Sequence, residues 1–229
     1  MASAAPALSV LLVEDHQLLA GTLAMALRAE GLDVTTAAGP SPEAVVDVAG
    51  AMAPVLVLLD LDLGPPLGNG LDMIRPLIDA GATVVVVTGV TDRARLGRCL
   101  EAGASGVISK ATEFERLVDA VRGAAEGRPI LREAERHDLL AEARTRRRVD
   151  DERLGPFRTL SPREQAVLAG LVAGASAETI AHRSYVSLAT VRSQIRAILL
   201  KLGVNSQLAA VALAREAGWS PDEGSGARL

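Results

Sequence analysis

The chain has 229 residues, of which 49% are hydrophobic, 23% charged and 2% aromatic, and this composition excludes a disordered protein. The length allows one large domain or two small ones, and no stretch reaches the ~20 apolar residues of a membrane span. The net charge of −4 divides into −7 over residues 1–125, zero over 126–153 and +3 over 154–229, which favours different partners for the two ends of the chain.

Residues 1–125 alternate between short apolar runs and longer amphipathic segments. Strands are predicted over residues 8–13, 32–37, 55–60, 83–88 and 105–108. Helices are predicted over residues 17–29, 42–52, 69–79, 92–102 and 112–125. Continuous apolar strands that alternate with helices predict an α/β doubly wound domain around a five-stranded parallel sheet, of flavodoxin-like type.

Three local features qualify this pattern. Residues 1–6 lack the basic start of a signal peptide, so we expect a cytoplasmic protein. The segment from Gly64 to Gly70 is dominated by glycine and proline and is predicted to be a loop with neither helix nor strand. The only cysteine, Cys99, excludes an intrachain disulfide and is expected to be a small apolar residue on a helix.

Polar side chains stand where four of the predicted strands end. Glu14 and Asp15 follow the first strand, Asp60 ends the third, Thr88 ends the fourth and Lys110 follows the fifth. Because ligands of open parallel sheets bind at the carboxyl ends of the strands, we expect these side chains to converge. Carboxylates suit Mg²⁺, and an aspartate can act as the nucleophile that accepts a phosphoryl group. Lys110 would pair with Asp60 and then with phosphate, and the Thr88 hydroxyl would bond a phosphoryl oxygen.

Residues 8–125 resemble the receiver domain of two-component response regulators. Four segments carry the resemblance: Val13 to Asp15, Leu58 to Asp62, Val87 to Gly89 and Ala102 to Lys110. It implies that Asp60 is the phosphoacceptor of a sensor histidine kinase and that Glu14, Asp15, Asp60 and Asp62 hold Mg²⁺. Asp15 would be the main metal carboxylate, Glu14 would act through bound water, and Asp62 would lend its backbone carbonyl.

The same resemblance assigns the residues that contact or sense the phosphate. Thr88 and Lys110 fall on the hydroxyl and lysine positions of the family. Val107 falls on the switch position, where the family usually carries an aromatic residue. His16, directly after the acid pair, is expected to start a helix rather than to bind a metal.

Residues 126–157 are predicted to form a partly helical linker. Glu133 to Arg148 is rich in Ala, Glu and Arg and has few apolar residues, as in a solvated helix. The alternative is a basic element that helps to hold DNA phosphates or an interdomain face.

From Leu160 onward the pattern is entirely helical. Ser161, Ser176 and Ser187 are predicted to cap the first three helices, and Glu164 completes a capping box with Ser161. A fourth helix is predicted from Ser206 to Ala217.

The third of these helices has two distinct faces. Its apolar residues recur at helical spacing and are expected in the core: Val191, Ile195, Ile198, Leu199 and Leu202. Small residues and arginines lie on the other side, a pattern that suits the major groove of DNA: Ala189, Arg192, Ser193 and Arg196. With the helix and turn before it, this segment is predicted to form a helix-turn-helix.

Residues 158–217 resemble the four-helix DNA-binding domain of LuxR type. Five segments carry the resemblance: Leu160 to Glu164, Ile180-Ala181, Val186-Ser187, Thr190 to Arg192 and Lys201 to Val204. It implies that Arg192, Ser193 and Arg196 face bases, that Thr190 contacts phosphate and that Lys201 belongs to the DNA-binding set. The last helix would supply a dimer surface that includes Ser206 and Val211.

Together the two parts resemble a response regulator of the NarL/LuxR (NarL/FixJ) type. The predicted domains are a receiver at 1–125, a linker at 126–157, a helix-turn-helix domain at 158–218 and a disordered tail at 219–229. The resemblance implies a transcription factor that binds promoter double-stranded DNA as a homodimer when phosphorylated. It implies no enzyme beyond a receiver that catalyses its own phosphoryl transfer and dephosphorylation.

Two alternatives remain open on the sequence. One is a regulator of the same architecture that responds to a ligand or to protein contact without phosphorylation, which Val107 leaves open. The other is a flavodoxin-like enzyme with a helical appendage, which would need a phosphate-binding glycine loop after the first strand. Residues Glu14 to Gln17 do not provide one.

Overall fold

The protein is described by a computed structural model that covers residues 9–37 and 39–221. The chain divides into two compact units between Thr145 and Arg146. Leu8, the predicted start of the first strand, and residues 222–229 of the predicted tail lie outside the described residues.

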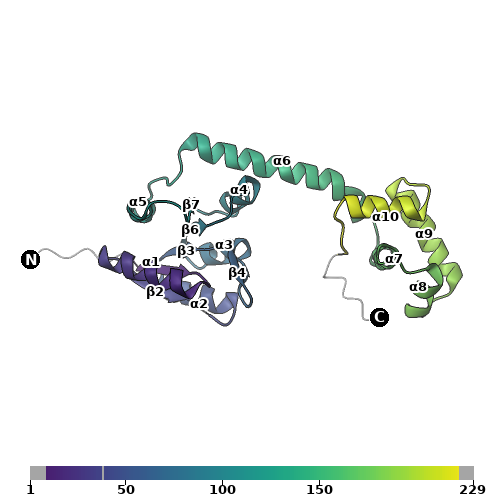
Figure 1. The fold of residues 1–229 in the computed structure, drawn as a ribbon, viewed down its shortest axis with the longest axis horizontal. Helices are drawn as coiled ribbons and strands as arrows, with labels where there is room; N and C mark the ends of the chain where they lie inside the picture. The colour runs from purple at the N-terminus through teal and green to yellow at the C-terminus, as the bar shows by residue number, and fades with distance from the viewer. Residues whose placement is uncertain (1–8, 38, 222–229) are drawn as a thin grey trace, which may run out of the picture. The chain divides into compact units, whose positions relative to one another are not determined.

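The first unit contains a five-stranded sheet (Figure 1). Its strands are β1 (Ser9–Val13), β2 (Asp33–Ala37), β3 (Leu56–Leu59), β6 (Thr83–Thr88) and β7 (Gly106–Ser109). All four pairings are parallel, in the order β2-β1-β3-β6-β7. This order confirms the predicted doubly wound sheet and puts its topological switch point between β1 and β3.

Alternate residues of the strands feed two cores, one on each face of the sheet. Val10 and Leu12 pack with α1 (Gln17–Ala29) and α5 (Phe114–Ala125). Leu11 and Val13 pack with α2 (Pro42–Met52), α3 (Gly70–Asp79) and α4 (Arg93–Glu101). Cys99 of α4 is a buried free thiol in this second core, as predicted, and burial raises its pKa to about 11.

The prediction of a loop without strands from Gly64 to Gly70 was wrong at both ends of the segment. A two-stranded antiparallel hairpin forms from β4 (Asp62–Gly64) and β5 (Gly68–Asn69). Gly64 and Gly68 have φ values of +58° and +74°, which favour glycine, so these residues can bracket the tight turn. α3 begins at Gly70, where the Asn69 side chain accepts a hydrogen bond from the Leu71 N–H.

The helix α6 (Glu133–Arg158) runs ten residues beyond Arg148, where the predicted helical segment ends. Ion pairs one helical turn apart support this extension, between Arg146 and Asp150 and between Arg148 and Glu152. Charged side chains cover most of this helix, so its end cannot be found from apolar periodicity.

The rest of the second unit consists of α7 (Pro162–Val172), α8 (Ala177–Arg183), α9 (Leu188–Leu202) and α10 (Gln207–Glu216). Each begins at a serine whose hydroxyl accepts a backbone N–H, and α7 has the predicted capping box. One core joins the four helices, and Trp219 stacks on Phe157 with ring centroids 5.5 Å apart. The helical domain with a helix-turn-helix is therefore confirmed.

Within the described residues, no single helix has the length and apolarity needed to cross a membrane. Among the same residues, α9 and α10 taken together meet those criteria, as a pair bent by 54°.

Candidate functional site

Carboxylates gather at the switch point of the sheet. Glu14 and Asp15 directly follow β1, and Asp60 directly follows β3. One side-chain atom from each of these acids and from His16 lies within 4.8 Å of the others. Glu14 and Asp60 are buried, with relative exposures of 8% and 4%. The structure thus brings together the acids that the sequence pattern predicted to converge, in a set of hard oxygen donors that suits a divalent cation.

Lys110 joins two of these acids. Its ammonium donates to Oδ2 of Asp60 at 2.8 Å and lies 2.6 Å from Oε2 of Glu14. Burial alone would lower the pKa of Lys110, but the hydrogen bonds to Asp60 and Glu14 outweigh it and raise the pKa. The lysine therefore stays charged at neutral pH.

The second oxygen of Asp60 is also held. Oδ1 accepts the Leu61 N–H at 2.7 Å, so each carboxylate oxygen has its own donor. These two bonds orient the carboxylate at the edge of the sheet. A carboxylate held in one orientation beside a cation is well placed to act as a nucleophile toward phosphorus.

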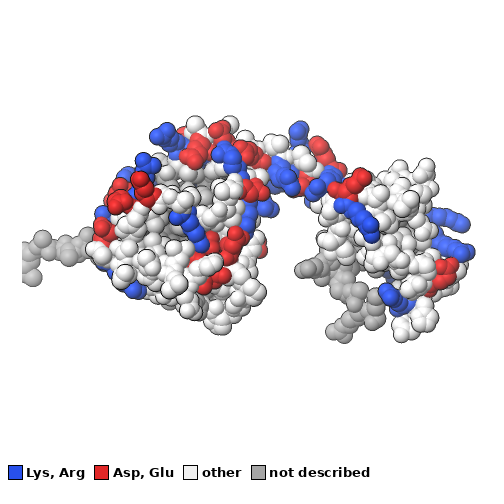
Figure 2. Space-filling view, in the orientation of Figure 1, with Lys and Arg blue, Asp and Glu red and all other residues white. Residues whose placement is uncertain are grey.

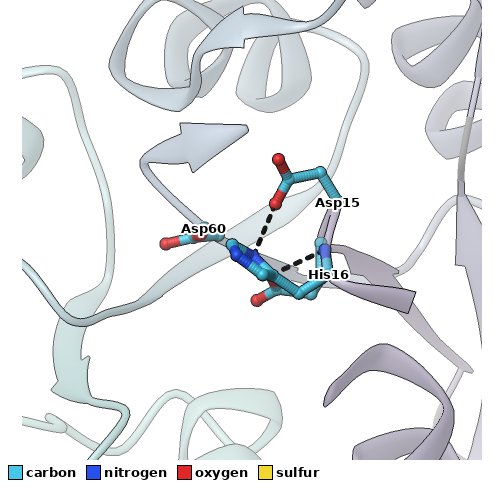
Figure 3. Close-up of side chains that lie close together, drawn as sticks. Asp15, His16 and Asp60 are labelled. Atoms are coloured by element: carbon cyan, nitrogen blue, oxygen red, sulfur yellow. Dashed lines mark hydrogen bonds and ion pairs between the residues drawn. The ribbon is translucent and has the colours of Figure 1, made fainter. Parts of the chain in front are cut away.

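His16 occupies the N-cap position of α1, so the predicted helix start is confirmed. Its ring also turns to the acids. Nδ1 lies 2.8 Å from Oδ1 of Asp15 (Figure 3) and 2.9 Å from Oε1 of Glu14. The hydrogen bond to Glu14, followed by the charge of Asp15, raises the pKa of His16. Position alone did not predict this contact.

Asp62 points to a different partner. Its Oδ1 lies 2.8 Å from Nη2 of Arg95, which belongs to α4. The same nitrogen lies 3.3 Å from the Leu61 carbonyl oxygen and 3.1 Å from Oδ1 of Asn69. Arg95 therefore ties α4 to both strands of the β4–β5 hairpin. The sequence analysis missed it, because Arg93, Arg95 and Arg98 look alike as charged residues of one helix.

Thr88 and Val107 lie farther along the sheet. Thr88 ends β6, is 1% exposed, and its hydroxyl accepts the Val90 N–H at 3.2 Å. Val107 pairs with Val86 in the neighbouring strand and is half-buried. On the other side of the acids, a cavity of about 460 Å³ borders Glu14, Asp15 and the turn of the hairpin.

In the second unit, α9 presents the two predicted faces. Val191, Ile195, Ile198 and Leu202 are buried, and Leu199 packs against the same core. Thr190, Arg192, Ser193 and Arg196 are exposed. Figure 2 shows Lys and Arg side chains that project from this unit where α8 and α9 lie. Arg192 has one weak partner, Glu178, at 3.6 Å.

The remaining predicted residues have local contacts of their own. Lys201 donates to Oε2 of Glu164 at 2.6 Å and to the Thr159 carbonyl at 3.0 Å, so its ammonium is engaged within the domain. Ser206 caps α10 through the Ala209 N–H, and Val211 packs partly against the core. Leu208, on the same helix, is 80% exposed.

Two family models match this chain. The response regulator receiver domain matches residues 10–122, and the luxR family of bacterial regulatory proteins matches residues 158–214. The RcsB response regulator of Salmonella typhimurium is a structural neighbour with a TM-score of 0.50 and 21% identity. That alignment covers 92% of this chain and 99% of the neighbour, and it supports the fold.

Curated relatives align over nearly the whole chain. The nitrate/nitrite response regulator NarP of Escherichia coli is 32% identical over 207 residues, 89% of this chain and 93% of the relative. The transcriptional activator DevR/DosR of Mycobacterium tuberculosis is 30% identical over 220 residues, 95% and 98% of the two chains. The chain therefore belongs to the two-component response regulators that join a receiver domain to a luxR-family DNA-binding domain.

Proposed function

We propose that this protein is a transcription factor switched by phosphorylation of Asp60 by a sensor histidine kinase. The observation that carries the proposal is Lys110, which bridges the buried carboxylates of Asp60 and Glu14 at the switch point of the sheet. An oxygen of Asp60 forms a bond to phosphorus as the bond from phosphorus to the kinase histidine breaks. The departing histidine nitrogen keeps the electron pair of the broken bond. The Lys110 ammonium then faces the negatively charged phosphoryl group on Asp60.

The acid cluster fits a divalent cation. Glu14, Asp15 and Asp60 would hold Mg²⁺, with the backbone carbonyl of Asp62 as the fourth contact. Mg²⁺ held there would supply positive charge that offsets the negative charge of the transferred group. Meanwhile the Asp62 carboxylate stays with Arg95, and Leu61 and Lys110 hold Asp60 in orientation.

The exposed face of α9 would read DNA. Arg192, Ser193 and Arg196 are proposed to contact base edges in the major groove, and Thr190 a phosphate. Lys201 is not carried into this set, because its ammonium already bonds Glu164 and Thr159.

The active form would be a homodimer on promoter double-stranded DNA, in the cytoplasm where that DNA lies. We place the dimer surface on α10, with Ser206 and Val211 and with the exposed Leu208 between them. The receiver would catalyse only its own phosphorylation and dephosphorylation, with Thr88 and Lys110 as phosphate contacts and Val107 as the sensing position.

The test is phosphate incorporation into the full chain incubated with Mg²⁺ and acetyl phosphate, read by intact mass. One phosphate is expected on the wild type and on Asp62→Asn, and none on Asp60→Asn. Phosphate on Asp60→Asn would remove Asp60 from its role. A wild type that takes no phosphate from this donor or from candidate kinases, yet binds DNA well, would favour a regulator that works without phosphorylation.

A further inference from the structure

The cavity that borders the acids has the size of a ligand site. Its volume is about 460 Å³, within the range of ~300–1,000 Å³ that is typical of small-molecule sites. Its lining includes the carboxylates Glu14 and Asp15 and, from the β4–β5 hairpin, Pro65, Pro66 and Leu67. The cavity therefore joins negative charge and apolar surface in one space.

The core of the receiver holds the apolar wall of this cavity in place. Leu63 of β4 and Leu67 of the turn are 1% and 7% exposed and pack in the core that α2 and α3 cover. Ala20 of α1 and Ala37 of β2 add small apolar side chains to the lining. Because two buried leucines anchor the hairpin, the wall is formed before any ligand binds.

The polar side chains of the lining determine which charge a ligand can carry. Glu14 and Asp15 are carboxylates, Gln17 and Thr36 are neutral, and none of the lining residues that the structure describes is Lys, Arg or His. An anion in this cavity would face two carboxylates without a basic side chain in the lining, which disfavours phosphates and organic acids. A cation would be attracted by the same two groups.

Asp15 offers the better position for a cation. Its Oδ1 contacts Nδ1 of His16 at 2.8 Å, and Figure 3 shows its other oxygen pointing away from that ring. This oxygen, Oδ2, lies beside the hairpin, since a Cβ placed on Gly64 would be 3.3 Å from it. The Asp15 side chain is 35% exposed, so it can exchange water for a ligand. Glu14, in contrast, is engaged by Lys110 and His16.

We infer that this cavity binds a small organic cation, whose ammonium group pairs with Asp15 and whose apolar body lies against the hairpin. An alkyl amine is charged at neutral pH, as the side chain of lysine is. Its ammonium donates a charge-assisted hydrogen bond to Oδ2 of Asp15, and its apolar body leaves water on contact with Leu63 and Leu67. This binding goes beyond the proposed function, because it requires no phosphorylation.

Such a ligand competes with Mg²⁺. This consequence rests on the proposed metal site, in which Asp15 is one of the carboxylates. An ammonium group on Asp15 holds that carboxylate toward the hairpin and adds a positive charge beside the acids, where it repels a divalent cation. The ligand therefore slows the Mg²⁺-dependent phosphorylation of Asp60.

Binding is tested by an NMR titration of the amide signals of the full chain, without metal or phosphodonor. The probe is 4-phenylbutylamine, and 4-phenylbutanol is its uncharged match. The amine should shift the signals of Gly21, Ala37 and Leu67 in a saturable manner. It should bind about tenfold more tightly than the alcohol, because a hydrogen bond between charged groups is the stronger one. No saturable shift at these residues would overturn the site, and equal affinity of amine and alcohol would overturn the preference for a cation.

The place of the apolar body is tested at Gly21. This residue of α1 lines the cavity, and a Cβ placed on it has no neighbour within 4 Å. Gly21→Phe should therefore fold, and it should lower the affinity for the amine by about tenfold or more, because its ring fills the apolar space. Gly155→Phe is the matched control, since a Cβ on Gly155 is equally unobstructed but lies in the second unit. Wild-type affinity in Gly21→Phe would overturn the assignment of this cavity.

The partner of the ammonium group is tested by Asp15→Asn. This variant should bind the amine no more tightly than the wild type binds the alcohol, because the charged acceptor is lost. Asp33→Asn, which removes an exposed acid at the start of β2, should bind the amine as the wild type does. An unchanged preference for the amine in Asp15→Asn would overturn the role of Asp15.

The competition is tested by titration with Mg²⁺ in the presence of the amine, followed by the same amide signals. Amine at about ten times its Kd should raise the apparent Kd for Mg²⁺ about tenfold in the wild type and leave it unchanged in Gly21→Phe. If the two ligands bound the wild type without mutual effect, the competition would be wrong and the amine site would stand. A chain that binds the amine but not Mg²⁺ would overturn the proposed metal site, and the competition with it.

Discussion

Two lysines of this molecule each bond a buried glutamate at 2.6 Å, yet their surroundings differ. Lys110 lies against Glu14 in the receiver, and Lys201 lies against Glu164 in the DNA-binding domain. Glu14 and Glu164 are each 8% exposed. Distance and burial alone would therefore assign the two pairs the same role.

The difference lies in the charge around each pair. Lys110 also faces Asp60, and Asp15 is within 4.8 Å of the same acids, so carboxylates outnumber the lysine. Around Lys201, the Thr159 carbonyl fills a second donor position and the Ser161 N–H donates to the Glu164 carboxylate. The excess of negative charge in the receiver favours the binding of a cation. The charges of Lys201 and Glu164 balance each other, and their ion pair joins α9 to the start of α7.

The largest effect is expected from the removal of each lysine. Lys110→Met and Lys201→Met should each destabilise their own unit by about 3–4 kcal/mol, because a buried carboxylate loses its partner. Mg²⁺ should restore most of the loss in Lys110→Met, since it supplies the missing positive charge, and none of it in Lys201→Met.

Two probes separate the units in the full chain. Trp219, the only tryptophan, stacks on Phe157 and reports the second unit by fluorescence during urea unfolding. Hydrogen exchange of β1 and β3 reports the receiver. If Mg²⁺ stabilised Lys110→Met and Lys201→Met equally, the proposed difference in charge between the two sites would be wrong.

The next largest effect is expected from the removal of Arg192 or Arg196, two exposed arginines of the DNA-binding domain. Arg192→Ala and Arg196→Ala should each weaken binding to a DNA duplex selected by the wild type, by about 1–3 kcal/mol. The urea midpoint of the Trp219 signal should stay unchanged, because both side chains are exposed. Arg163→Ala, an exposed arginine of α7, serves as control. Wild-type affinity in both variants would mean that another face of the domain binds DNA.

A smaller effect on the stability of the DNA-binding domain is expected when the pH is lowered. Burial alone would raise the pKa of Glu164, but the hydrogen bonds from Lys201 and Ser161 hold it below its ordinary value of 4.5. The pair therefore stabilises the domain above the unfolded-state pKa, and this contribution is lost as pH falls through the folded-state value. Protonation leaves no buried negative charge, so the loss should be smaller than in Lys201→Met. Unfolding followed at Trp219 from about pH 6 to pH 3 should depend less on pH in Glu164→Gln than in the wild type.

The smallest effect is expected at the turn between α8 and α9. Tyr185 has a φ of +52° and its side chain is 90% exposed, so the fold gains little from the ring. Tyr185→Gly should raise the stability of the domain by up to about 1 kcal/mol, because glycine adopts this backbone conformation without strain. A lower urea midpoint would show that the tyrosine ring stabilises the domain.

Much of the fold and part of the site can be predicted from the sequence, for identifiable reasons. Asp60 and its neighbouring acids follow apolar runs whose ends are easy to place, and parallel strands bring those ends to one edge. Helix caps at Ser161 and Ser187 are local and were predicted correctly. The hairpin at Asp62 to Asn69 was missed because glycine and proline conceal the pairing of two short strands.

The contacts that were not predicted join distant segments through residues that are ordinary in sequence. Arg95 reaches a hairpin whose existence was not foreseen, and Gly97 meets Leu139 more than forty positions later. Lys201 has the charge of a DNA contact, but the buried Glu164 opposite it depends on how α7 packs. Periodicity shows which face of a helix is apolar and does not show which segment will cover it.

One measurement tests most directly whether the excess negative charge in the receiver binds Mg²⁺ and supports phosphorylation of Asp60. The full chain would be incubated with Mg²⁺ and acetyl phosphate, treated with borohydride to mark any acyl phosphate, and mapped by peptide mass spectrometry. A single mark at Asp60, dependent on Mg²⁺, is the predicted result. A mark on Glu14, Asp15 or Asp62 instead, or incorporation that does not depend on Mg²⁺, would contradict the account.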